Sequence, residues 1–442
     1  MDYTFKAGYG RRDITPDWSV PLAGNYHSER RLNTSVGLPI MASCVALSDG
    51  ETTLLWYSLD IVRPDTERFT MVRHKIAEAT GVPFENIFTC CTHTHSSIDP
   101  GSPLDAVKNW YPVFIEKMIE AAREAIADLA PAEAFAGEIE THEMVFTRRY
   151  FLKDGSFCGL AKGTPTEDNP IVRHETTADP MLDVVKFTRE GKRDIVMINF
   201  GVHVTKCSGK DTYYMLTSDW PGAVRQQIEE KGNCRFIFFN SGEGNTVAFS
   251  RMKWKEMDHY PIEEYAPRMT AYILRALKYA QPVKTGKICV HNYPYPSVVD
   301  HTQDDRIEDA RYVMKIWEED DRDAAMVAAK ERGFSGYYQA MNLEIRYNKP
   351  EKIDMELCTA TFGDLGLAAV PFEMFCETSR EIKDQSPCKH TFVCSCTQGF
   401  EEYVPTKEAF PNGAYEVESC RFFAGQAELY RDKLLEMLHD KD

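Results

Sequence analysis

Two histidines, two positions apart, follow a short apolar run in the segment FTCCTHTHSSID, residues 88–99. In a β-strand, residues i and i+2 point to the same side, so we expect His93 and His95 to project together while Thr92 and Thr94 point away. Such a pair can bind one cation, or one histidine can bind it while the other works beside it as an acid or base. For this pair alone, two hydrogen-bonded histidines at the end of a strand explain the pattern equally well.

Further side chains able to bind a metal follow other apolar, strand-like runs. His203 comes after RDIVMINFGV, and Glu373 comes after LGLAAVPF, where we expect it to open a helix. Tyr403 and Tyr415 lie in FEEYVPTKEAFPNGAYEVES, which follows TFVCSC. Ligands of α/β sheets collect outside the carboxyl ends of strands, so these segments predict one site assembled from distant parts of the sequence. Imidazole nitrogens together with carboxylate and phenol oxygens suit Zn²⁺ in an open, catalytic site.

Strand-like and helix-like segments alternate along the chain, with a long helix expected over residues 106–129. This alternation predicts an α/β fold, a mixed β-sheet core layered with helices and an active site at the strand carboxyl ends. Residues 341–347, MNLEIRY, are predicted to form a strand. We interpret residues 1–442 as a single large catalytic domain, and the charged stretch 295–340 as a helical excursion or lid.

Composition excludes some classes of partner. The formal net charge is −17 and no long cluster of lysine and arginine occurs, which argues against nucleic-acid binding. No window approaches 18 uninterrupted apolar residues, so no membrane span or stable membrane association is expected. The thirteen scattered cysteines and the absence of a secretory signal predict a reduced, cytoplasmic protein. A small-molecule substrate is expected, and whether the chain forms a homo-oligomer stays open.

Eight short motifs occur in the order found in the neutral ceramidase N-terminal domain family, which the sequence therefore resembles over nearly its whole length. The motifs are AGYGRRDITP, SLDIV, THTHS, FTRRYFLKDG, GVHVT, GEGN, VPFEMF and EYVPTKEAF followed by YE. The resemblance implies a catalytic zinc whose ligands correspond to His93, His203, Glu373 and Tyr403. It implies that His95 acts as general base, and that Arg148 and Tyr415 line the site. Thr147 stands where the family usually has asparagine, which leaves Arg148 and Arg149 as alternatives.

The sequence also departs from this family. A GDVSP-like stretch carries an active-centre serine in the ceramidases, whereas GEGNTVA here puts Val247 at that place, with Thr246 beside it. The chain ends soon after the YE motif, so we expect a divergent member without the family's C-terminal immunoglobulin-like domain. With no secretory signal and no apolar segment suited to a membrane interface, we do not expect a membrane lipid such as ceramide to be the substrate.

From these observations we predict a metal-dependent, amidase-like hydrolase. It would cleave an amide or ester bond in a soluble substrate with a zinc-activated water. A first alternative keeps the metal and uses His95 for proton transfer in a lyase, epimerase or isomerase acting on a sugar-like molecule. A second alternative is an inactive, metal-stabilised binding protein. The sequence does not identify the substrate.

Overall fold

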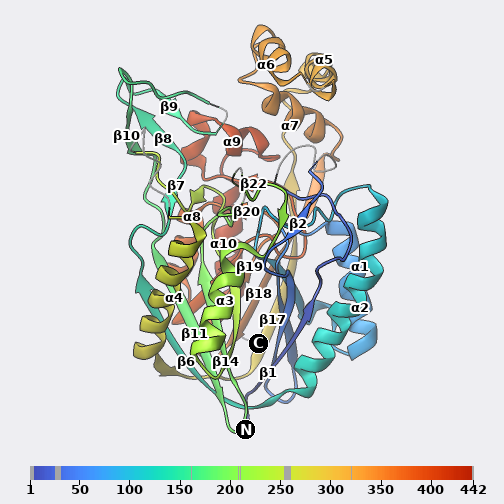
Figure 1. Ribbon diagram of the computed structural model, residues 1–442, viewed down its shortest axis with the longest axis vertical. Helices are drawn as coiled ribbons and strands as arrows, with labels where there is room; N and C mark the ends of the chain where they lie inside the picture. Colours follow the sequence, from blue (N-terminus) through green and yellow to red (C-terminus); the bar gives the residue numbers. More distant parts are fainter. Residues whose placement is uncertain are drawn as a thin grey trace.

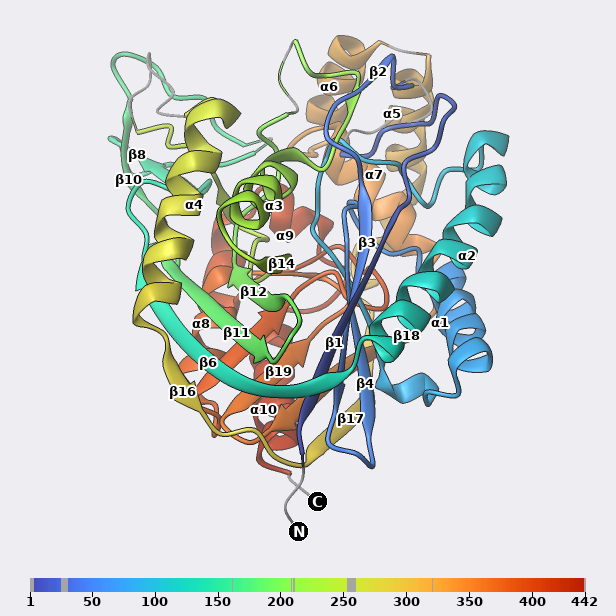
Figure 2. The same cartoon turned by 60° about the horizontal axis from the view of Figure 1, so that its bottom comes forward.

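The computed structural model describes residues 4–24, 31–160, 162–207, 209, 211–252, 260–319 and 321–440. A large mixed sheet forms the centre of the molecule (Figures 1 and 2), with its strands in the order β14-β12-β11-β6-β1-β3-β4-β5. These strands are β1 (Lys6–Asp13), β3 (Met41–Ser48), β4 (Thr53–Leu59), β5 (Ile87–Cys91), β6 (Ala130–Glu140), β11 (Met181–Arg189), β12 (Asp194–Phe200) and β14 (Cys234–Asn240).

A smaller sheet packs against one face of the large one. Its strands run in the order β17-β18-β19-β21 and comprise β17 (Ile288–Val298), β18 (Lys352–Phe362), β19 (Leu365–Ala369) and β21 (His390–Cys394). Apolar side chains of both sheets meet in one buried cluster. In it, the Trp56 ring lies 4.1 Å from that of Phe239 in the large sheet and 5.8 Å from that of Phe392 in the small sheet. This shared core fixes the two sheets relative to each other.

Helices cover the outer faces of both sheets. On the large sheet, α1 (Thr66–Thr80) and α2 (Asp105–Ala127) cover one half, and α3 (Asp219–Lys231) and α4 (Ile262–Tyr279) cover the other. The small sheet is covered by α8 (Cys376–Gln385) and α10 (Gln426–His439). The predicted α/β class with a mixed sheet layered by helices is confirmed. Among the helices of the described ranges, none is long and apolar enough to cross a membrane.

Parallel strand pairs set the position of the site. The units β4–α1–β5, β12–α3–β14 and β19–α8–β21 each join two parallel neighbours through a helix. The two carboxyl ends of such a unit therefore emerge at the same edge. The three units meet there, since Asn240 Nδ2 donates to the Thr92 carbonyl at 3.0 Å and the Ser395 N–H donates to the Asn240 carbonyl at 3.3 Å.

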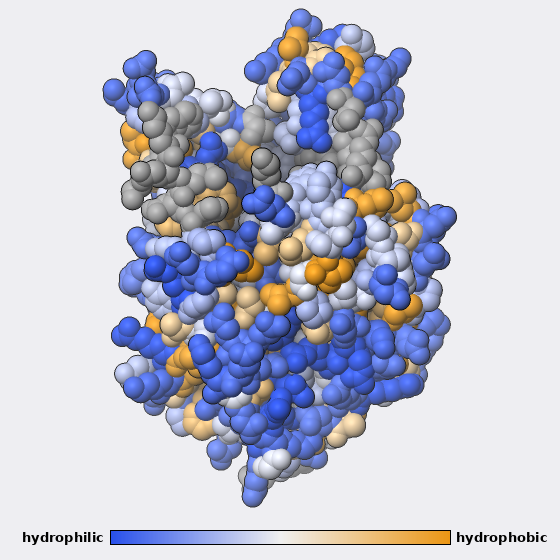
Figure 3. Space-filling model, viewed as in Figure 1, coloured by the Kyte–Doolittle hydropathy of each residue, from blue (hydrophilic) through white to orange (hydrophobic). Residues whose placement is uncertain are grey.

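Two projections rise beyond this edge, at the end of the molecule opposite the termini (Figure 1). One consists of α5 (Ile307–Glu318), α6 (Arg322–Glu331) and α7 (Tyr337–Tyr347), which share their own apolar cluster. The other contains β8 (Tyr150–Leu152), β9 (Phe157–Cys158) and β10 (Ile171–His174). Figure 3 shows a hollow between them. The stretch 295–340 includes most of the helical projection, and its movement as a lid stays a prediction.

The predicted strand over residues 341–347 is wrong, because this segment forms most of α7. Its apolar residues alternate as in a strand, but they are not all buried, and Ile345 is 36% exposed. The buried residues Tyr337, Ala340 and Leu343 instead recur at three-residue spacing and face the α5–α7 cluster. Packing within the projection therefore selects a helix.

Candidate metal centre and active site

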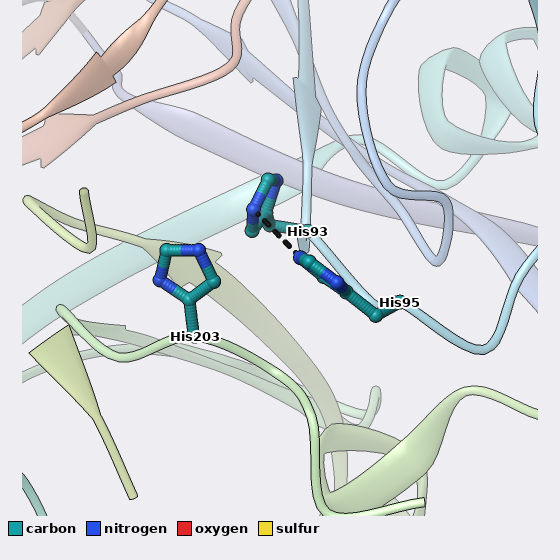
Figure 4. A group of neighbouring side chains, drawn as sticks. All are labelled: His93, His95 and His203. Carbon is teal, nitrogen blue, oxygen red and sulfur yellow. Dashed lines mark hydrogen bonds between the residues drawn. The ribbon is translucent and has the colours of Figure 1, made fainter. Parts of the chain in front are cut away.

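The two histidines of the THTHS motif lie beyond the end of a strand. β5 ends at Cys91, and His93 adopts a φ of 64°, in the left-handed region that is costly for any residue other than glycine. The prediction that strand alternation aligns them is therefore wrong. Backbone hydrogen bonds hold this turn, with His93 N donating to Ile61 O and His95 N donating to Val204 O, both at 3.1 Å. The two imidazoles nevertheless converge, with 3.2 Å between their Nε2 atoms (Figure 4).

His203 follows β12 and turns its ring toward the same centre (Figure 4). Its Nδ1 lies 2.7 Å from the Glu243 carbonyl, and His93 Nδ1 lies 2.8 Å from the Val62 carbonyl. A carbonyl oxygen can only accept, so both Nδ1 atoms carry a proton, and each ring in its neutral form presents an Nε2 lone pair inward. Fixing the tautomer through the outer nitrogen is the usual arrangement of histidines that bind a metal.

Glu373 completes this centre from a short strand. The predicted helix beginning at Glu373 is wrong, since α8 begins at Cys376 and residues Glu373–Met374 form β20. β20 pairs in parallel with β22 (Tyr403–Val404), which places Glu373 directly beside Tyr403. The backbone of this segment is held on both sides, because Glu373 N donates to Glu402 O and Gly244 N donates to Met374 O, each at 2.8 Å. Long-range pairing, which local periodicity does not reveal, overrides the helical pattern.

The Glu373 carboxylate faces two imidazole nitrogens at once. Its Oε2 lies 3.1 Å from His203 Nε2 and 3.4 Å from His93 Nε2. This oxygen accepts no hydrogen bond from any described residue. Lone pairs approach this closely only when positive charge lies between them. One proton can serve only one of the two contacts, whereas one cation serves both. The donor set therefore fits a divalent metal such as zinc.

The protonation states of Glu373 and His203 are consistent with that fit. Burial raises the pKa of Glu373, but the neighbouring His93 and His203 outweigh it and hold the pKa well below its usual range. Burial, reinforced by the Arg148 charge, lowers the pKa of His203 to about 4. A carboxylate that is ionised and an imidazole that is neutral at pH 7 are the forms that bind metals.

His95 lies beside the centre, within reach of both other histidines. The donor atoms of His93, His95 and His203 all lie within 4.8 Å of one another. Burial, together with these two neighbours, lowers the pKa of His95 well below its ordinary value, so its ring is neutral. A Cβ at Gly24 would come within 2.3 Å of His95 Nδ1. Only glycine fits at position 24, and the Gly24 backbone limits the positions that the His95 ring can take.

Tyr403 and Arg148 bound the site on the side of His203. The Tyr403 hydroxyl lies 3.4 Å from His203 Nε2 and accepts a hydrogen bond from Arg148 Nη2 at 3.1 Å. Burial raises the pKa of Tyr403 well above its ordinary 10, so its phenol is neutral at pH 7 unless a cation lies against it. The Tyr415 ring lies 5.5 Å from that of Tyr403.

The structure distinguishes the two adjacent arginines. Arg148 Nη1 lies 3.3 Å from His203 Nε2, and its Nε donates to Glu416 Oε1 at 2.7 Å. Arg149 is fully buried and pairs with Glu175 and, at 3.0 Å, with Glu416. Arg148 therefore faces the site, whereas Arg149 supports the wall behind it through the same glutamate.

The GEGN segment contributes a residue that the sequence analysis did not single out. Glu243 is fully buried, and its Oε1 lies 3.4 Å from Cys396 Sγ, which in turn lies 3.6 Å from His93 Nδ1. An acid between two glycines directly after a core strand is the signal that could have drawn attention to it. Thr246 is fully buried, donates its hydroxyl to the Gly201 carbonyl at 3.1 Å, and is not among the residues that line the cavities at the centre.

Two cavities open onto the centre. The smaller, about 140 Å³, is lined by Gly24, Val62, Arg63, His93, His95, Glu373, Phe400, Glu402, Tyr403 and Tyr415. The larger, about 390 Å³, is lined by Gly24, His95, Arg148, Leu160, His203, Thr205, Val247, Phe249, Arg251, Tyr338, Tyr403 and Tyr415. They share Gly24, His95, Tyr403 and Tyr415, so a substrate bond held at the centre has room on either side of it.

The fold is similar to that of neutral ceramidases. The crystal structure of neutral ceramidase from Pseudomonas aeruginosa aligns with a TM-score of 0.73 and 16% sequence identity, covering 99% of this chain and 74% of that one. A ceramidase complexed with C2 gives a TM-score of 0.74 at 16% identity, with 99% and 75% covered. No family model and no curated protein matches the sequence. At this identity the likeness establishes a shared fold, so the chemistry must be argued from the residues of the site.

Proposed function

We propose that the protein is a zinc-dependent hydrolase that cleaves an amide or ester bond in a small, soluble substrate. One observation carries the proposal. His93 Nε2 and His203 Nε2 both face Glu373 Oε2 at 3.4 and 3.1 Å, in a buried site that opens into two cavities. The similarity of the fold to neutral ceramidases, whose name describes amide hydrolysis, supports the same class of reaction.

The residues that would hold the metal are His93, His203, Glu373 and Tyr403. When bound, zinc polarises a carbonyl group and lowers the pKa of a water molecule to about 7. Tyr403 differs from the other three, because its buried phenol must lose or share its proton in order to bind. Arg148, 3.1 Å from the phenol oxygen, favours the ionised form.

His95 would move the proton. Its neutral imidazole lies beside His93 and lines both cavities, so it can take a proton from the attacking water and pass it to the leaving group. Arg148 and Tyr415 would donate hydrogen bonds to the oxygen that becomes negatively charged when water attacks the carbonyl. Glu416 holds Arg148 in place with a 2.7 Å hydrogen bond, and such preorganised donors need not move during the reaction.

The reaction class can be tested with heavy-oxygen water. Zinc-loaded protein is incubated with a panel of amides and para-nitrophenyl esters, and the acid product is analysed by mass spectrometry. We expect one heavy oxygen atom in the acid, formed in wild type and not in His95→Gln. Turnover of a sugar-like substrate without incorporation of solvent oxygen would contradict hydrolysis and indicate a lyase, epimerase or isomerase. Zinc binding with no turnover of any substrate class would favour a binding protein.

A further inference from the structure

The two cavities differ in charge. Among the described residues, the smaller cavity is lined by Arg63 together with the acids Glu373 and Glu402. No acidic residue lines the larger cavity within the described ranges, and its charged residues there are Arg148 and Arg251. This cationic lining is unusual in a chain whose formal net charge is −17. The larger cavity therefore favours an anionic group.

The two arginines of the larger cavity are not equivalent. Arg148 is already engaged, with hydrogen bonds to Glu416, the Gly244 carbonyl and Tyr403 at 2.7, 2.9 and 3.1 Å. The Arg251 guanidinium makes no hydrogen bond or ion pair with any residue that the structure describes. A guanidinium offers paired donors that match the two oxygens of a carboxylate. Within the described part of the chain, Arg251 is thus the cationic group of this cavity with unused capacity to bind an anion.

The surroundings of Arg251 strengthen such an interaction. Leu160, Val247 and Phe249 line the same cavity, and so does Tyr338, which belongs to α7 of the helical projection. Apolar walls lower the local dielectric constant, which makes an ion pair stronger than it is in water. The volume of about 390 Å³ lies within the range of sites for small ligands.

We infer that the substrate of the proposed hydrolase carries a carboxylate, which Arg251 binds in the larger cavity while the scissile bond lies at the histidine cluster. The inference rests on the proposed function and narrows its substrate class. It assigns Arg251 to substrate selection. The other moiety of the substrate then occupies the smaller cavity, where Arg63 and Glu402 carry opposite charges.

The test compares matched neutral and anionic esters. On the acyl side the pair is para-nitrophenyl butyrate and the mono-para-nitrophenyl ester of glutaric acid, and on the leaving-group side it is phenyl acetate and para-carboxyphenyl acetate. For at least one pair, zinc-loaded wild type should prefer the anionic ester about 10- to 100-fold in kcat/KM. Arg251→Gln should remove this preference and Arg251→Lys should keep part of it. Arg275→Gln, which removes the same charge from an exposed position on α4, should keep all of it.

Hydrolysis of both pairs without an anionic preference, or equal ratios in Arg251→Gln and wild type, would overturn the inference and leave the proposed function standing. If the wild type binds zinc but hydrolyses none of the esters, calorimetric titration with glutarate decides the inference alone. Glutarate binding in wild type and Arg275→Gln that is lost in Arg251→Gln supports the carboxylate site. Equal binding, or no binding, in all three proteins overturns it.

Discussion

His95 is the residue whose role the geometry constrains most directly. Its Nε2 lies 3.2 Å from that of His93, close enough for either a metal ligand or a proton acceptor. If His95 transfers protons, the His95→Gln variant should keep its zinc and lose about 10²- to 10⁴-fold in kcat. Metal analysis and steady-state kinetics on the same preparation check this, with His142→Gln, at an exposed histidine, as the matched control. Loss of zinc together with activity in His95→Gln would show that His95 is a ligand.

Arg148 and Arg149 should separate catalysis from stability. Arg148→Lys keeps a positive charge near Glu416 but loses the second guanidinium nitrogen that donates to Tyr403. We therefore expect kcat to fall by about 10²-fold, with little change in the free energy of unfolding. Arg149→Ala leaves the buried Glu416 with one partner fewer and should lower that free energy by about 3–5 kcal/mol. Steady-state kinetics and urea unfolding distinguish the two effects. The opposite pattern would mean that Arg149 faces the substrate.

At the scale of elements, the sequence predicted the strands and helices that carry the site, because their apolar periodicity is strong. The βαβ units follow from buried strands joined by amphipathic helices. The errors lie where tertiary contacts override local pattern. The strand expected within α7 and the helix expected at Glu373 both yield to packing or pairing with residues far away in the sequence. Strand alternation predicts that His93 and His95 lie together, but a left-handed turn is what brings them together.

The start of α3 contains a pH-dependent element. Burial raises the pKa of Asp219 from 3.8 to about 6, even though its carboxylate accepts backbone hydrogen bonds from Cys207 and Trp220. The folded chain therefore holds this proton more tightly than the unfolded chain. As the pH rises from 3.8 to about 6, the contribution of Asp219 to the free energy of unfolding falls by roughly 2–4 kcal/mol. It remains lower at higher pH.

Asp219→Asn removes this titration. The free energy of unfolding of the variant, relative to wild type, should therefore rise by roughly 2–4 kcal/mol between about pH 4 and pH 7. Urea unfolding of both proteins at the two pH values measures the difference. A difference that does not change with pH would mean that the carboxyl has the same pKa in the folded and unfolded chain.

At the scale of the whole molecule, the site is a product of how the two sheets pack. His93 and His203 come from the large sheet, while Glu373 and Tyr403 follow strands of the small one. No local segment contains the site, so the sequence could indicate its members only through their shared position after strands. Glu243 has only the weaker signal of an acid between two glycines after a core strand, and the place of Arg251 at the site emerges only from the assembled fold.

Metal content tests the central claim most directly. Wild type, His203→Ala and His142→Ala are stripped with a chelator, reconstituted with zinc, dialysed and analysed by elemental mass spectrometry, with circular dichroism to confirm folding. We predict about one zinc per chain in wild type and in His142→Ala, and none in folded His203→Ala, because His203 supplies one of the converging lone pairs. Zinc-free wild type, or His203→Ala holding as much zinc as wild type, would contradict the account.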